Sequence, residues 1–221
     1  DVSIRRAASA AFQESVGRLA LFPHGIDVIR MTDFYAVSVR RNAFLECAVK
    51  VAGFEEYRAY LLDHLLDVVT VHWDPAMRRL GAQSVALIAM HDPAVLLPEI
   101  TARLAKRIST SDNAVLHGSL LTLAELSRLS RTLSNDQASV GEATRATCFS
   151  LLDAVRPSMF RSLGASSILQ SACQLIGSAF PPSTTSSTNE TQTWETVLNL
   201  ALARQEEPVH AAGAGAISQL S

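Results

Sequence analysis

The chain has 221 residues, of which 48% are hydrophobic, so it is long enough for one large domain or a row of stacked repeats and too apolar to be intrinsically disordered. Its 19 basic and 21 acidic residues give a formal net charge of −2, which argues against a bulk attraction to nucleic acid or anionic lipid. No apolar run approaches the roughly 18 residues of a transmembrane helix, so no membrane span is predicted.

The first third of the sequence predicts helices separated by short breaks. In chain order, helices are expected over residues 4–21, 26–31, 33–51 and 55–71. Pro23 and Gly25 interrupt the first two, and Gly53 ends the third. Asp33 is placed to cap the third helix at its N-terminus.

A pair of helices is predicted between Trp73 and Thr110. Asp74 stands at an N-cap position, and Pro75 follows it at the first helical position, where its missing N–H is not needed. The dipeptide at residues 92–93, Asp-Pro, repeats the same start signal. We therefore expect one helix, a tight turn and a second helix folded back on the first.

The rest of the chain also has helical spacing. Helices are expected over residues 113–129, 142–155, 163–180, 194–204 and 209–220, with a loop at 135–141. Residues 181–190 consist almost entirely of Pro, Ser, Thr and other polar residues. Such a segment has nothing to bury, so a mobile polar loop is predicted there.

A similar pattern recurs along the chain. Ser3–Phe12, Ser38–Cys47 and Ala76–Val85 share a form with two adjacent arginines, and Ala114–Leu120 is a fainter copy. The starts at residues 3, 38, 76 and 114 are 35, 38 and 38 residues apart. A period near 40 with two helices per unit is typical of HEAT or armadillo repeats.

The predicted fold is therefore an all-α, HEAT/armadillo-type right-handed α-solenoid of about five helical pairs. The expected repeats span roughly residues 3–37, 38–75, 76–113, 114–166 and 167–221 of a single solenoid. The sequence opens inside a repeat and stops within a helix, so we expect a fragment of a longer solenoid. Cys47, Cys148 and Cys173 are odd in number and lie in apolar helical stretches, which favours buried thiols in a reducing compartment.

The doubled arginines are the first candidate partner-binding residues. They are Arg5, Arg6, Arg40, Arg41, Arg78 and Arg79, at equivalent places in three repeats. Stacked repeats would align them into a basic row that could meet an acidic partner. The alternative is an internal ladder, in which each arginine binds an acid or a carbonyl of the adjacent repeat.

Two aromatic segments are further candidates. Phe22 and His24 lie in a loop ending at Asp27, which is either a contact loop or a shaped turn with Phe22 in the core and Asp27 capping the next helix. Trp73 is either a partner contact or the filler of a corner between repeats.

No catalytic residue, metal site or cofactor is predicted. Asp63, His64 and Asp67 lie close in sequence, but metal sites need more ligands at a matching spacing. Cys47 has no base beside it, and Gly213-Ala-Gly215 lacks the rest of a dinucleotide-binding loop.

The first 130 residues resemble the tubulin-folding cofactor D family. The segments that carry the resemblance are Arg5–Glu14, Val16–Arg18, Phe22–Asp27, Asp33–Val37, Ala52–Phe54, Glu56-Tyr57, Asp63–Leu65, His72–Asp74 and His117–Ser119. The long opening segment and the Phe-Pro-His-Gly-Ile-Asp loop are specific, because a generic HEAT repeat would not contain them.

The resemblance implies a non-enzymatic chaperone segment that binds β-tubulin. It implies a role in assembly and disassembly of the αβ-tubulin dimer, together with tubulin cofactors C and E and an Arf-like small GTPase. It also implies a contribution to GTPase activation within that complex, in the cytoplasm and at the microtubule cytoskeleton. The alternative is a HEAT-repeat scaffold for protein–protein interaction in trafficking or signalling.

Overall fold

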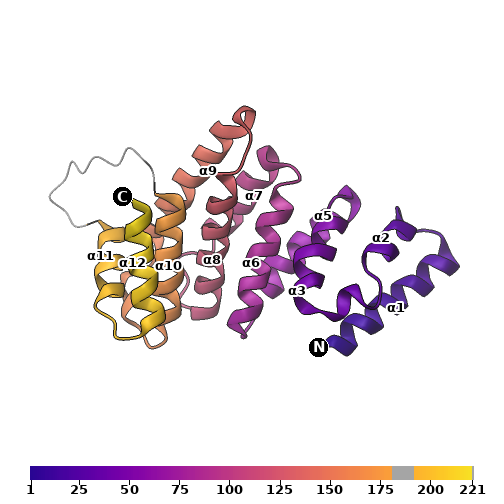
Figure 1. Ribbon diagram of the computed structural model, residues 1–221, viewed down its shortest axis with the longest axis horizontal. Coiled ribbons are helices and arrows are strands. Elements are labelled where there is room, and N and C mark those ends of the chain that lie inside the picture. Colours follow the sequence, from indigo (N-terminus) through magenta and orange to yellow (C-terminus); the bar gives the residue numbers. More distant parts are fainter. Residues whose placement is uncertain (181–191, 221) are drawn as a thin grey trace.

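The computed structural model describes residues 1–180 and 192–220, and every regular element within these ranges is a helix (Figure 1). The α-helices are α1 (Val2–Leu19), α2 (Gly25–Met31), α3 (Arg40–Asn42), α4 (Ala48–Val51), α5 (Glu55–His64), α6 (Pro75–Ala89), α7 (Pro93–Ala105), α8 (Asn113–Ser130), α9 (Ala138–Ser150), α10 (Ala165–Ala179), α11 (Thr193–Leu202) and α12 (Glu207–Leu220). Shorter 3₁₀ or π helices are η1 (Ala36–Ser38), η2 (Ala43–Cys47), η3 (Leu65–Val69), η4 (Asn135–Gln137), η5 (Leu151–Ala154) and η6 (Pro157–Arg161). The predicted all-α solenoid is confirmed, while the predicted loop at 181–190 lies outside the described residues.

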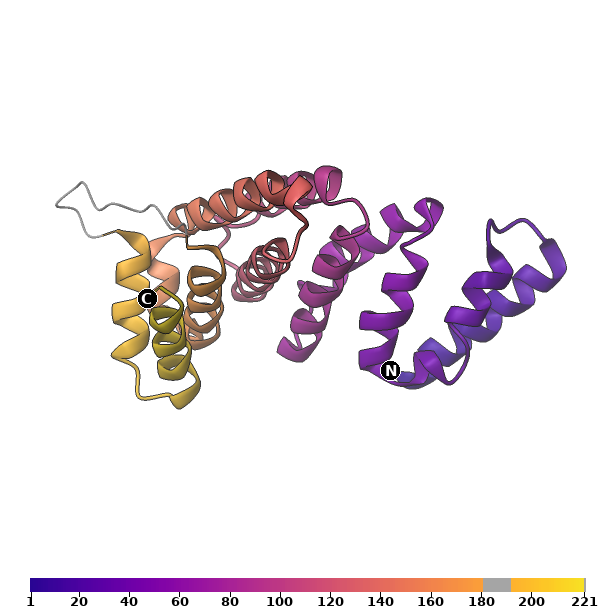
Figure 2. The ribbon, with the colours of Figure 1, turned by 45° about the horizontal axis from the view of Figure 1, so that its top comes forward.

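The helices stack side by side along one long axis, from α1 at one end to α11 and α12 at the other (Figure 1). Helices α6, α8, α10 and α12 pack against one another in that order, and we call them the inner layer. Helices α7 and α9 pack on each other and form an outer layer, while α11 packs on α10 and α12 at the end of the row. In Figure 2, α7 and α9 lie across the top, and the inner-layer helices lie below them.

The start signals predicted from the sequence position the inner layer. Asp74 accepts a hydrogen bond from the amide of Ala76 at 2.9 Å, with Pro75 at the start of α6. Asp112, which was not predicted as a cap, caps α8 in the same way, through the amides of Ala114 and Val115. The capped ends satisfy backbone N–H groups that a helix otherwise leaves free.

The core is centred on α8, between α6 and α10. Leu116, Leu120 and Leu123 of α8 have 0% exposed surface and recur at helical spacing. Gly118 lies so close to the end of η3 that a Cβ atom on it would be 1.7 Å from the carbonyl oxygen of Thr70. Only glycine therefore permits this approach of α8 to the end of η3.

Three expected elements differ from those observed. The helix predicted over 33–51 is broken. Asp33 accepts hydrogen bonds from the amides of Tyr35 and Ala36 in the turn that leads into the short η1, and Val39 is extended before α3 begins. The helix predicted over 55–71 ends in the π turn η3. The loop predicted over 135–141 is wrong, since η4 and the first turns of α9 occupy most of it. Among the described residues, no helix is both long and apolar enough to cross a lipid bilayer.

Candidate interaction surfaces

The first arginine of each doubled pair bonds to residues at or near the start of the following repeat. Arg5 donates from Nε to the carbonyl of Val37 at 2.7 Å and from Nη2 to that of Ser38 at 2.8 Å. Arg40 lies 3.5 Å from a carboxylate oxygen of Asp74. These contacts correspond to the internal-ladder alternative for the first arginines.

Arg78 is buried, with 6% of its surface exposed. Its Nε donates to Nδ1 of His117 at 2.8 Å, and its Nη1 donates to the carbonyls of His72 at 2.6 Å and Trp73 at 3.0 Å. Because Nδ1 accepts, the His117 ring is neutral and carries its proton on Nε2. Burial, followed by the charges of Arg78 and Arg79, lowers the pKa of His117 to about 4. Arg78 thus links α6 to α8 and leaves a gap in any basic surface row.

The second arginines differ from the first. The guanidinium of Arg6 lies over the ring of Phe34, 4.4 Å from its centroid, in a cation–π contact. Arg41 and Arg79 are exposed, and neither forms an ion pair with any residue that the structure describes. Their contact with a partner stays a prediction.

The loop that carries Phe22 and His24 is anchored to α5 and its start. His24 adopts a left-handed backbone conformation, with φ of 51°, and its ring stacks on Phe54 at 4.3 Å. The hydroxyl of Tyr57 donates to the carbonyl of Pro23 at 2.6 Å. Phe22 is not in the core: it packs edge-on against the Phe12 ring at 5.3 Å and remains 38% exposed.

Asp27 does not cap α2 as one alternative expected. The N-cap position is occupied by His24, and no side chain bonds to the helix start there. Asp27 lies within the first turn instead, where its charge favours the positive end of the helix dipole. The loop is therefore a turn fixed by its contacts with α5, and the Phe22 ring in it remains partly exposed to solvent.

Trp73 does not fill a corner between repeats, since 82% of its surface is exposed. Its ring neighbour is His72, at 5.2 Å between centroids. The corner is closed by Arg78, which bonds to the carbonyls of both residues. An exposed tryptophan on a rigid turn can bury a large apolar area when a partner binds. The role of Trp73 as a partner contact stays a prediction.

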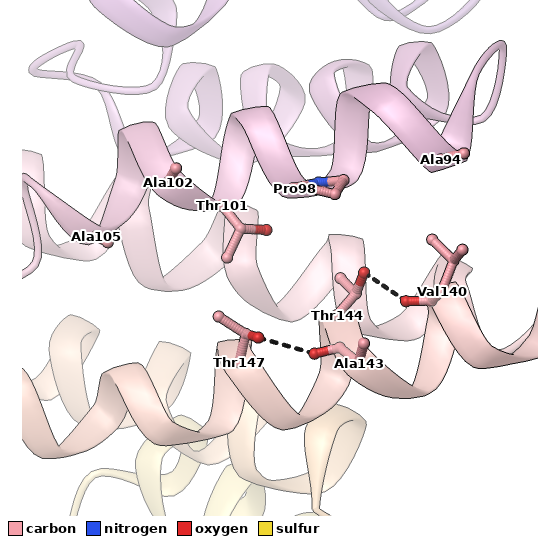
Figure 3. A pocket seen from close by; sticks show the side chains of 9 residues that line it. All are labelled: Ala94, Pro98, Thr101, Ala102, Ala105, Val140, Ala143, Thr144 and Thr147. Atoms are coloured by element: carbon pink, nitrogen blue, oxygen red, sulfur yellow. Dashed lines mark hydrogen bonds between the residues drawn. The ribbon is translucent and has the colours of Figure 1, made fainter.

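A shallow cleft of about 380 Å³ separates α7 from α9 in the outer layer (Figure 3). Its lining is small and mostly apolar, from Ala94 to Ala105 on one side and Val140 to Thr147 on the other. The hydroxyls of Thr144 and Thr147 bond to carbonyls of their own helix, as Figure 3 shows. The Thr101 hydroxyl on the α7 side likewise donates to the carbonyl of Leu97, so all three threonine hydroxyls of the lining are bonded within their own helices.

The inner layer carries a larger groove, of about 870 Å³, which we call the inner groove. Its lining comes from four helices, α6, α8, α10 and α12, and includes Arg79, Gln83, Glu125, Arg128, Gln174 and Gln219. Sequence reasoning missed it because residues from 79 to 219 meet there only after the repeats stack. The regular spacing of Gln170 and Gln174 on one face of a helix was the available signal.

The two acidic residues considered above as metal ligands, Asp63 and Asp67, form ion pairs with arginines of α7 and of the turn after it. Asp63 and Asp67 pair with Arg103, at 2.7 and 3.4 Å, and Asp67 also pairs with Arg107. The hydrogen bond from Arg107 is the main reason that the pKa of Asp67 is lowered. In the described part of the chain, no three His, Cys, Asp or Glu side chains cluster where a metal ion could bind.

The three cysteines are buried and have raised thiol pKa values. Burial raises the pKa of Cys148 to about 11 and that of Cys173 to about 12. Burial also raises the pKa of Cys47. Such thiols stay protonated at neutral pH and are poor nucleophiles.

Comparisons with known proteins match the opening of the chain to a family described as Tubulin-specific chaperone D-like, ARM repeats, over residues 1–26. The chain is 28% identical over 128 residues, 57% of its length, to Tubulin-specific chaperone D of Dictyostelium discoideum. It is 30% identical over 103 residues, 45% of its length, to Tubulin-folding cofactor D of Schizosaccharomyces pombe. The resemblance to tubulin-folding cofactor D is confirmed.

The similarity covers a small part of each relative. The chain matches 9% of the length of the Dictyostelium protein and 9% of the Schizosaccharomyces protein. No solved structure matches the chain.

Proposed function

We propose that this chain is a non-enzymatic segment of a tubulin-folding chaperone and that it binds β-tubulin. The observation that carries the proposal is the similarity over 128 residues to a protein named Tubulin-specific chaperone D. In this role the segment takes part in assembly and disassembly of αβ-tubulin. It acts together with tubulin cofactors C and E and an Arf-like small GTPase, in the cytoplasm and at the microtubule cytoskeleton.

The proposed mechanism is surface complementarity on a curved scaffold. Stacked repeats present side chains at fixed spacing along one face, and partners are held by many of them at once. Any GTPase activation then belongs to the assembled complex, with this chain positioning the partners. We assign it no catalytic residue.

Trp73 is the contact residue with the largest proposed contribution. It combines 82% exposure with a turn fixed by two hydrogen bonds from Arg78. A buried tryptophan at the centre of an interface often contributes 2 kcal/mol or more, which corresponds to roughly thirtyfold in affinity. Phe22, His24 and the exposed Arg41 and Arg79 are proposed as additional contacts.

The test is retention of purified αβ-tubulin, and separately of the Arf-like GTPase, on the immobilised chain. Tubulin is expected to bind the parent and to bind Trp73→Ala about thirtyfold more weakly. Tyr60→Ala is the matched control, because Tyr60 is an aromatic residue with 77% exposure that lies on α5.

Circular dichroism must show that both variants keep the helix content of the parent. Absence of tubulin binding at concentrations well above micromolar would contradict the proposed function. Equal loss in both variants would remove Trp73 from the contact but keep tubulin as the partner.

A further inference from the structure

The inner groove has a buried floor and a polar rim. Leu121, Ala124 and Cys173 of its lining are buried, with exposed fractions of 4%, 6% and 0%. Arg79, Arg128 and Arg131 are exposed and also line it. The groove crosses the inner layer from α6 to α12, so its occupant must be long enough to touch several helices.

The charges in the groove do not balance. Glu125 is the one carboxylate among the described residues that line it, and it pairs with Arg128 at 2.7 Å. Arg79 and Arg131 have no carboxylate partner in the described part of the chain, and Arg131 donates only to the carbonyl of Gly177 at 3.1 Å. The positive charges of Arg79 and Arg131 are therefore available to a negatively charged occupant. The groove is locally positive, although the whole chain has a formal net charge of −2.

The remaining polar lining suits a polypeptide main chain. Gln170 and Gln174 of α10 and Gln219 of α12 lie in the groove, and Gln83 of α6 lies 3.5 Å from Glu125. No hydrogen bond to another described residue is made by Gln170 or Gln174. A carboxamide both donates and accepts, so it can pair with the N–H and C=O groups of an extended chain.

The lining disfavours a nucleic acid as the occupant. Proteins that bind single strands combine positive charge with aromatic side chains on which bases stack. The described residues that line the groove include no aromatic side chain. Small side chains such as Ala211, Ala212 and Gly215 line it instead, which leaves room for the side chains of a bound peptide.

We propose that the inner groove binds an extended, acidic segment of a partner polypeptide. Arg79 and Arg131 pair with its carboxylates, and the glutamines pair with its main chain. Apart from Arg79, which is also among the proposed tubulin contacts, the groove shares no residue with that contact set, which includes Trp73 and the loop at Phe22. The inference goes beyond the proposed function, because it assigns a second surface and does not require tubulin to be the partner.

The test uses fluorescence anisotropy with the complete chain and a labelled twelve-residue peptide of alternating glutamate and glycine. A peptide with glutamine in place of glutamate is the charge control. The acidic peptide is expected to bind at least tenfold more tightly than the glutamine peptide. Its affinity should fall as salt is raised, because the charges lie at an open surface.

Two matched double variants place the binding in the groove. Arg79→Gln with Arg131→Gln should weaken binding of the acidic peptide at least tenfold. Arg156→Gln with Arg161→Gln removes the same charge at exposed positions that do not line the groove, and it should leave the affinity within twofold. If Arg131 proves necessary for folding, Arg79→Gln alone should give an intermediate loss, because the Arg79 side chain has no hydrogen-bond or ion-pair partner among the described residues.

The proposal is overturned if the acidic peptide does not bind at millimolar concentration, if both double variants weaken it equally, or if the glutamine peptide binds as tightly. Tighter binding of a single-stranded RNA oligonucleotide that is lost in the same groove variant would also overturn it. The peptide contains no tubulin sequence. Its failure to bind therefore leaves the tubulin retention experiment unaffected, and the reverse is also true.

Discussion

Helices α1 and α8 are each 18 residues long, yet they are packed in opposite ways. No residue of α1 is buried, whereas 12 residues of α8 are. Helix α8 lies between α6 and α10 and contacts both extensively, while α1 contacts mainly α2 and η1. Tertiary packing rather than helix propensity provides most of the stability of a helix in a protein, so the two ends of the molecule should differ in stability.

The apolar residues of α1 show the same difference. Ile4 is 69% exposed and Leu19 is 54% exposed, although both belong to the apolar pattern that predicts the helix. Leu116, Leu120 and Leu123 of α8 are fully buried. An amphipathic pattern therefore identifies a helix but does not state how much of its apolar face is covered.

The largest expected difference comes from the same glycine-to-alanine change in the two helices. Gly118→Ala places a Cβ atom 1.7 Å from the Thr70 carbonyl oxygen, so α8 and η3 must move apart. Overpacking against backbone should lower the free energy of unfolding by about 3 kcal/mol or more. A Cβ atom on Gly17 of α1 would have no heavy atom within 4 Å. Gly17→Ala should therefore raise the free energy of unfolding by about 0.5–1 kcal/mol.

Urea unfolding followed by circular dichroism measures both variants. If unfolding is not a single transition, amide hydrogen exchange in each helix gives the local values. A Gly118→Ala variant as stable as the parent would mean that the close approach of α8 to Thr70 is absent in solution.

The next largest difference is expected for leucine truncation. Leu120 has 0% exposure, so Leu120→Ala removes buried methyl groups and leaves a cavity. The free energy of unfolding should fall by about 3 kcal/mol. Leu19→Ala in α1 should change it by less than about 1 kcal/mol, because that side chain is already 54% exposed. Equal effects in the two helices would contradict the difference in packing.

Local signals in the sequence predicted the helices well, and contacts between repeats were harder to predict. Asp74 with Pro75 predicted the start of α6, because a cap depends on residues next to each other in the chain. The exposure of Trp73 and the burial of Arg78 depend on how one repeat lies on the next. The inner groove could not be predicted for the same reason, as its lining is drawn from four helices.

The buried pair of Arg78 and His117 predicts a dependence of stability on pH. The pKa of His117 is about 4 in the folded chain and about 6.5 in an unfolded one. Between these values the unfolded chain binds a proton that the folded chain does not, so stability is lost as pH falls from 6.5 towards 4. This one group should contribute a slope of about 1.4 kcal/mol per pH unit within that window.

His117→Gln should flatten the slope by that amount, because glutamine keeps a hydrogen-bond acceptor and does not titrate. Between pH 7 and 8 His117 is neutral in both states, so the unfolding free energies of parent and variant should run parallel there. Measurements above pH 4.5 avoid most of the titration of carboxylates such as Asp67, whose pKa is lowered. A parallel course from pH 7 down to 4.5 would show that His117 is accessible to protons in the folded chain.

The smallest expected effect separates the two interpretations of the doubled arginines at the weakly packed end. Arg5→Met keeps the apolar stem but removes the donors to the carbonyls of Val37 and Ser38, so it should lower the free energy of unfolding by about 1 kcal/mol. Arg41→Met removes an exposed side chain and should change it by less than about 0.5 kcal/mol. Both variants lose one charge, so a basic row that meets an acidic partner predicts equal losses in tubulin affinity. An internal ladder predicts lost stability only for Arg5→Met, because Arg5, unlike Arg41, bonds to the segment that follows α1. Thermal unfolding combined with tubulin retention therefore assigns each arginine to one interpretation.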